Sequence, residues 1–104
     1  MIDSASDVYA ELWISLASVL RSYTAAHGIH NNRHATVEAT EQKIMARFEE
    51  KWLSLNREGA IVTWTRENGS SGSLVMSEAG QLRTETSEEE MDMAAEAWAR
   101  ELMQ

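Results

Sequence analysis

The first third of the chain carries hydrophobic residues at the spacing of an α-helix. Projected at about 100° per residue, the large apolar side chains of residues 6–27 fall within an arc of roughly 140°. They are Val8, Tyr9, Leu12, Trp13, Leu16, Val19, Leu20 and Tyr23. Ser4 or Ser6 can cap the start, and Gly28 stands where the residue after a helix is expected. The pattern predicts one amphipathic helix, with Ile14 alone outside its apolar face.

Residues 36–48 allow two interpretations. Apolar and polar residues alternate there as in a strand, whereas Ile44, Phe48 and Trp52 also have helical spacing. We favour strands, because a hairpin motif follows directly. That motif is residues 56–60, Asn-Arg-Glu-Gly-Ala, whose glycine occupies the position of a three-residue loop that requires a positive φ.

The hairpin sets a register once its loop length is chosen. With a three-residue loop, Asn56 lies opposite Ala60 and Trp52 lies opposite Trp64. Successive pairs alternate between the two faces of a sheet. The tryptophan pair is therefore expected on the face away from the main core.

Three further turns extend the meander. They fall at residues 49–50, at the Gly/Ser-rich residues 67–72, and at residues 78–80. The first is the least favoured, because Glu rarely adopts a positive φ. The pairs that these turns predict are Ala46 with Leu53, Arg66 with Ser73, and Met76 with Leu82. The predicted core face of the sheet holds Ile44, Ala46, Phe48, Leu53, Leu55, Ile61, Leu74, Met76 and Leu82.

The C-terminal segment predicts a second helix. Residues 87–90, Ser-Glu-Glu-Glu, fit a capping box at a helix start. The apolar side of that helix is Met91, Ala94, Ala95, Trp98 and Leu102. The fold class is therefore α+β: an N-terminal helix, an antiparallel meander of about five strands, and a C-terminal helix packed on the sheet. We expect residues 1–104 to form a single domain.

The composition of the chain indicates the kind of cellular compartment in which the protein is expected. With 43% hydrophobic and 25% charged residues, the chain is typical of a globular protein. It contains no cysteine, which excludes disulfides and thiolate chemistry. The N-terminus lacks the pattern of a secretion signal, and no apolar run approaches the roughly 18 residues of a membrane span. We therefore expect a cytoplasmic protein with no membrane association.

Charge narrows the choice of partner. Seventeen acidic against nine basic side chains give a formal net charge of −8. Such a charge repels phosphate backbones and anionic lipids, so nucleic acid is not an expected partner. It increases solubility and is compatible with a basic protein partner. We expect the partner to be a second copy of the chain or another protein.

Three histidines are the candidates for metal ligands. His27, His30 and His34 have the spacing that would align them on a helix. Gly28 and the two asparagines at 31–32 instead predict a polar loop over residues 29–35, and no carboxylate of that segment is near enough to orient a ligand. The expectation is a solvated loop, with no metal and no cofactor.

No group of residues has the pattern of a catalytic site. The histidines cluster in one segment, the carboxylates are dispersed, and no serine lies in a Gly-x-Ser-x-Gly motif. The Gly/Ser run 67–72 lacks the lysine and the following helix of a phosphate-binding loop. We expect a protein that is not an enzyme.

The sheet face opposite the predicted core remains the strongest functional candidate. Tryptophan and arginine occur together there, as at interaction hot spots. One helix could cover each face, both helices could share the core face, or a cleft between sheet and helix could bind a flat ligand. We expect a homodimer or small adaptor that binds through this face, with the small-ligand pocket as the alternative function. The expected interface residues are Trp52, Trp64, Val62, Arg47 and Val75.

Overall fold

The computed structural model describes residues 4–29 and 34–104, which form two helices and one seven-stranded sheet. Strand order follows the chain, and each strand pairs antiparallel with the next, so the sheet is a meander. The elements are α1 (Ser4–Gly28), β1 (Thr36–Ala39), β2 (Lys43–Phe48), β3 (Lys51–Glu58), β4 (Ile61–Arg66), β5 (Ser71–Met76), β6 (Gln81–Arg83), β7 (Glu88–Glu90) and α2 (Met91–Leu102). The predicted α+β fold is confirmed, with more strands than the five expected.

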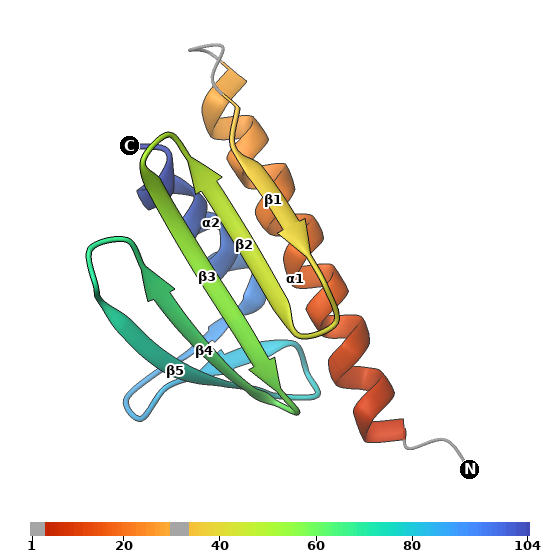
Figure 1. Cartoon of the computed structure of the whole chain (residues 1–104). Coiled ribbons are helices and arrows are strands. Elements are labelled where there is room, and N and C mark those ends of the chain that lie inside the picture. Colours follow the sequence, from red (N-terminus) through yellow and green to blue (C-terminus); the bar gives the residue numbers. More distant parts are fainter. Residues whose placement is uncertain (1–3, 30–33) are drawn as a thin grey trace.

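Both helices lie on the same face of the sheet. Figure 1 looks onto the sheet with α1 and α2 behind it, side by side and in contact with each other. One continuous core joins Trp13 and Leu20 of α1, Ile44 and Leu55 of the sheet, and Ala95 of α2, all of them fully or almost fully buried. The arrangement with one helix on each face is therefore wrong, and the opposite sheet face carries no helix.

Helix α1 follows its predicted apolar pattern closely. Its buried face centres on Trp13, Leu16 and Leu20, whereas Ile14 is 68% exposed, as its position outside the apolar arc predicts. The helix runs from Ser4 through Gly28, so the glycine is its last residue and not the one that follows it.

The strand interpretation of residues 36–48 is confirmed by β1 and β2. The β2–β3 hairpin has the predicted register, with Ala46 opposite Leu53. Its turn uses Glu49 at a φ of 57°. A non-glycine residue in this region costs about 1–3 kcal/mol, which the buried pairs of the two strands offset. Alternating burial therefore specifies the hairpin despite an unfavourable turn residue.

The predicted register between β3 and β4 is wrong by three residues. The strands are joined by a two-residue turn, Gly59-Ala60, with a φ of 62° at its first position, as in a type II′ turn. A loop of three residues and a turn of two can both use Gly59 at the position of positive φ. The two-residue turn extends β3 to Glu58. Because three is an odd number, β4 presents its other face to the core. Val62 is completely buried, and Ile61 is 51% exposed.

A second displacement of three residues, between β4 and β5, restores the predicted orientation further on. Trp64 pairs with Gly72. The predicted register, with Arg66 opposite Ser73, would instead place Trp64 opposite Val75. The second odd displacement cancels the first, so Leu74 of β5 faces the core as predicted. The next pair, Met76 with Leu82, is confirmed. The error in face assignment is therefore confined to β4.

The predicted capping box is wrong. Residues 88–90 form the strand β7, which pairs with β6, and α2 begins only at Met91. Glu90 is the N-cap residue of α2 and makes no side-chain capping hydrogen bond. Pairing with β6 supplies these backbone groups with partners, and Glu88 forms an ion pair with Arg83 across the two strands.

Both edges of the sheet are protected against further strand pairing. At the β1 edge, Arg21 of α1 donates a hydrogen bond of 3.1 Å to the carbonyl oxygen of Val37, and Trp13 donates one of 2.9 Å to that of Thr40. The β7 edge consists of three exposed glutamates. Charged and covered edges disfavour edge-to-edge association. Neither helix combines the length and hydrophobicity that crossing a membrane requires, among the residues that the structure describes.

The orientation of β4 can be tested by truncating two neighbouring side chains. We expect Val62→Ala to lower the free energy of unfolding by about 2 kcal/mol, because it opens a cavity in the core. Ile61→Ala, the matched control on the exposed face, should change it by less than about 0.5 kcal/mol. Urea denaturation measures both free energies. A larger loss in Ile61→Ala than in Val62→Ala would support the three-residue loop and its register instead.

Candidate functional site

The sheet surface away from the helices, here called the open face, is formed by alternate residues of the seven strands. The registers place 19 residues on it. They are Thr36, Glu38, Lys43, Met45, Arg47, Trp52, Ser54, Asn56, Glu58, Ile61, Thr63, Thr65, Ser71, Ser73, Val75, Gln81, Arg83 and Glu88 with Glu90 at the β7 edge. Small hydroxyl side chains occupy its centre, so larger groups stand out at its two ends.

Two apolar patches lie at opposite ends of the open face. Ile61 and Val75 are direct cross-strand partners, 51% and 46% exposed. At the other end, Trp52 lies opposite Arg47, with Met45 in the adjacent row. An isolated exposed apolar residue is ordinary on a protein surface, but a directly opposed exposed pair on an uncovered sheet is a contiguous patch.

The structure divides the five predicted interface residues between the two faces. Trp52, Arg47 and Val75 lie on the open face, as expected. Val62 and Trp64 do not, because the displaced register turns both toward the helices. The predicted cross-strand pair of Trp52 with Trp64 therefore does not exist: Trp64 lies opposite Leu55.

Trp64 has a different role from the one that was predicted. Its indole lies directly over Gly72 on the neighbouring strand, where a Cβ atom would come within 2.6 Å of the ring. The guanidinium of Arg66 lies 5.1 Å from the ring centroid, within the range of a cation–π contact. Glycine in a strand commonly marks such a close approach. Trp64 is thus a packing residue at the edge of the core.

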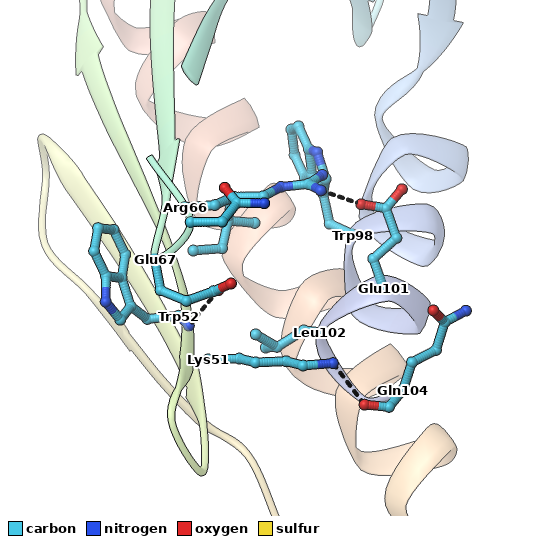
Figure 2. Close-up of a pocket in the computed structure, with 10 residues that line it drawn as sticks. Lys51, Trp52, Arg66, Glu67, Trp98, Glu101, Leu102 and Gln104 are labelled. Atoms are coloured by element: carbon cyan, nitrogen blue, oxygen red, sulfur yellow. Dashed lines mark hydrogen bonds and ion pairs between the residues drawn. The ribbon is translucent and has the colours of Figure 1, made fainter. Parts of the chain in front are cut away.

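A cleft of about 400 Å³ lies on the helical side of the sheet, and we call it the α2 cleft. It separates the start of β3 and the end of β4 from the C-terminal turns of α2 (Figure 2). Its lining residues are Lys51, Trp52, Leu53, Arg66, Glu67, Asn68, Trp98, Glu101, Leu102 and Gln104.

Two basic side chains cross the α2 cleft from sheet to helix. Arg66 forms an ion pair of 2.5 Å with Glu101, and Lys51 donates a hydrogen bond of 2.6 Å to the carbonyl oxygen of Gln104 (Figure 2). Trp52 points away from α2, while its backbone N–H donates to the carboxylate of Glu67 at 3.2 Å. The cleft therefore has charged groups at both ends.

Sequence reasoning offered a pocket between sheet and helix as the alternative site, but it did not assign Lys51, Arg66 or Trp98 to it. Trp98 was identified only as part of the apolar side of the last helix, and Lys51 received no role. Residues 51, 66 and 98 come together only when the meander returns α2 to the start of β3. Local periodicity contains no information about that return, so no pattern in the sequence could have indicated which residues line the cleft.

Two of the three candidate metal ligands, His27 and His34, lie within the described residues. His27 contacts Glu96 of α2 at 2.8 Å, and the other oxygen of Glu96 accepts a hydrogen bond of 2.8 Å from Arg100. His34 is exposed, and His30 lies outside the described residues. Within the described ranges, 4–29 and 34–104, no three His, Asp or Glu side chains are grouped as metal ligands. His27 instead links the two helices.

A second polar contact between the helices changes the acidity of a tyrosine. The hydroxyl of Tyr23 donates a hydrogen bond of 3.1 Å to Asp92. This bond raises the pKa of Tyr23 above its ordinary value of 10.0, and the charges of Asp92 and Glu96 act in the same direction. The contact stabilises the fold below pH 10 and is lost as the pH rises through the raised pKa.

The described residues thus form an α+β fold with two candidate sites, the open face and the α2 cleft. Comparison with known proteins adds no relative. No family model matches the chain, and neither a curated protein nor a solved structure matches it.

The contact between Trp64 and Gly72 predicts a specific sensitivity. Gly72→Ala places a methyl group against the indole, so we expect a loss of about 1–3 kcal/mol of unfolding free energy from overpacking. Ser73→Ala, an exposed neighbour on the same strand, should be nearly neutral. Urea denaturation monitored by tryptophan fluorescence tests both. Equal stability of the two variants would contradict the close approach.

The Tyr23 contact predicts a change in titration. In a Tyr9→Phe background, Tyr23 is the one tyrosine of the chain. We expect Asp92→Ala to lower the pKa of Tyr23 toward 10.0, because it removes the acceptor and its charge. Absorbance of the phenolate measures the midpoint. Glu101→Ala on the same helix is the control, and an unchanged midpoint in Asp92→Ala would refute the assignment.

Proposed function

We propose that the protein is a non-enzymatic interaction domain that self-associates through its open face. The observation that carries the proposal is that both helices cover the same side of the seven-stranded sheet. The opposite side keeps Trp52, Ile61 and Val75 at the surface of the single chain. A second copy is the partner that the surface fits best.

An uncovered sheet face is not by itself an interface, because one face of an antiparallel sheet can contact water. The apolar patches distinguish this face. Ile61 and Val75 stand directly opposite each other, and both are about half exposed. In a two-fold symmetric pair, the same patches occur on both copies, so one patch of each copy can cover the other patch of its partner. The small hydroxyl side chains between them permit close approach.

Charge favours a second copy over a strongly charged partner. The whole chain has seventeen acidic and nine basic side chains. On the open face, the basic side chains of Lys43, Arg47 and Arg83 nearly balance four glutamates. Two such faces meet with little net repulsion, whereas the excess negative charge lies elsewhere on the molecule. A basic partner would bind better outside the open face.

The size of the face sets the expected strength. Seven strands about 4.8 Å apart span roughly 30 Å, and six residues of a strand extend about 20 Å. Because β1, β6 and β7 are shorter than this, each copy offers at most about 600 Å², and a pair buries at most about 1,200 Å² in total, the lower limit of stable interfaces. We expect a weak dimer in equilibrium with the monomer.

Solution mass measured over a concentration series tests the proposal. Sedimentation or light scattering should show a dimer that forms as the concentration approaches hundreds of micromolar. Ile61→Glu and Val75→Glu should abolish it, because each buries a carboxylate at the centre of an apolar patch.

The matched control is Ile14→Glu on α1, since Ile14 is 68% exposed and lies away from the open face. It should leave the dimer intact. A wild-type protein that stays monomeric throughout the series would overturn the proposal. Loss of the dimer in Ile14→Glu alone would assign the interface to the helix.

A further inference from the structure

The α2 cleft brings together two cations that belong to neighbouring strands. Lys51 begins β3 and Arg66 ends β4, so the antiparallel pairing brings them to the same end of the sheet. Both face the helical side, the same side as Leu53. Figure 2 shows both side chains reaching across the cleft toward α2. Two carboxylates, those of Glu67 and Glu101, line the same cavity, so any role for the cations depends on the donors that they leave unused.

Both cations have donors beyond those that the fold uses. Arg66 pairs with Glu101 through Nη1 and stacks on Trp64, which leaves its Nε and Nη2 donors for another acceptor. The ammonium of Lys51 has three hydrogens and one acceptor, the carbonyl oxygen of Gln104. These donors face a cavity that solvent reaches. They are placed to bind an oxygen anion.

Three apolar side chains also line the cleft, among its polar groups. Leu53 and Leu102 line the cleft from the sheet and from α2, and Trp98 adds the surface of an indole. Trp98 itself is 9% exposed, so its ring is held in place by the core. A volume of about 400 Å³ is within the range of small-molecule pockets. A flat apolar group is the complement of these walls.

The ion pair of Arg66 with Glu101 is the contact that a ligand must compete with. The side chain of Glu101 is 47% exposed, and exposed ion pairs contribute little to stability. The other side-chain carboxylate of the cleft, Glu67, accepts a hydrogen bond from the backbone N–H of Trp52. A ligand carboxylate can therefore share or replace Glu101 at the guanidinium, which binds carboxylates through two parallel hydrogen bonds.

From these contacts we infer that the α2 cleft binds a small organic carboxylate with a flat apolar group, its anionic end between Lys51 and Arg66 and its ring against Trp98. A cationic ligand would offer no acceptor to the spare donors of Lys51 and Arg66. A neutral one would leave the spare donors without a partner. The inference does not depend on self-association, because the cleft lies on the helical side of the sheet and the open face on the other.

Titration of the protein with 2-naphthoate, followed by NMR, tests the inference. The Trp98 indole N–H and the Arg66 Nε–H should shift with saturation. The neutral analogue 2-naphthylmethanol should bind at least about tenfold more weakly, because it lacks the charge-assisted hydrogen bonds. Inorganic phosphate alone should bind no more tightly than the alcohol, because it lacks the apolar group.

Two substitutions make opposite predictions. Lys51→Gln should weaken 2-naphthoate roughly fivefold to tenfold. Glu101→Gln should strengthen it, because it removes the competing carboxylate from Arg66. A gain in affinity cannot result from damaged folding. Arg83→Gln, which removes an exposed ion-paired cation outside the cleft, should leave the dissociation constant unchanged.

Three results would overturn the inference. Equal affinity for 2-naphthoate and its alcohol would reduce the site to an apolar surface. Weaker or unchanged binding of 2-naphthoate in Glu101→Gln would show that Arg66 does not bind the ligand. Loss of binding in Ile61→Glu would place the ligand at the interface between copies. Conversely, naphthoate binding retained by a monomeric Ile61→Glu protein separates this site from the proposed interface.

Discussion

Burial of a single face of the sheet beneath both helices is the constraint from which the rest of the structure follows. The apolar face of α1, centred on Trp13 and Leu20, and that of α2, centred on Ala95, pack on the same side of the sheet and against each other. The polar contacts between the helices, including His27 with Glu96, form at the rim of this core. One face of the sheet is consequently covered by the two helices, and the other is left to solvent or to a partner.

The stack of Arg66, Trp64 and Gly72 connects this core to both candidate sites. Only glycine leaves room for the indole, so Gly72 holds the β4–β5 register in which Trp64 faces the helices. The same register turns Ile61 outward, and it directs Arg66 into the α2 cleft, where it reaches Glu101. A change at one close contact between strands would therefore alter the open face and the cleft together.

The two candidate sites share strand β3 but occupy its opposite sides. Trp52 projects toward the open face, and its neighbours Lys51 and Leu53 line the cleft (Figure 2). This arrangement is the ordinary alternation of a strand. It also means that a ligand in the cleft and a second copy on the open face would contact consecutive residues.

The sequence by itself determined the two helices, the strands of residues 36–48, the β2–β3 register and nearly all of the core, because periodicity reports which side of each element is apolar. Three features of the fold were determined only by the tertiary structure. Gly59 fits a loop of two or three residues, so only packing selects the face of β4 that buries Val62. Residues 88–90 fit a helix start equally well until β6 supplies a strand to pair with. The α2 cleft requires the end of the chain to return to Lys51, a contact between distant segments that no local pattern encodes.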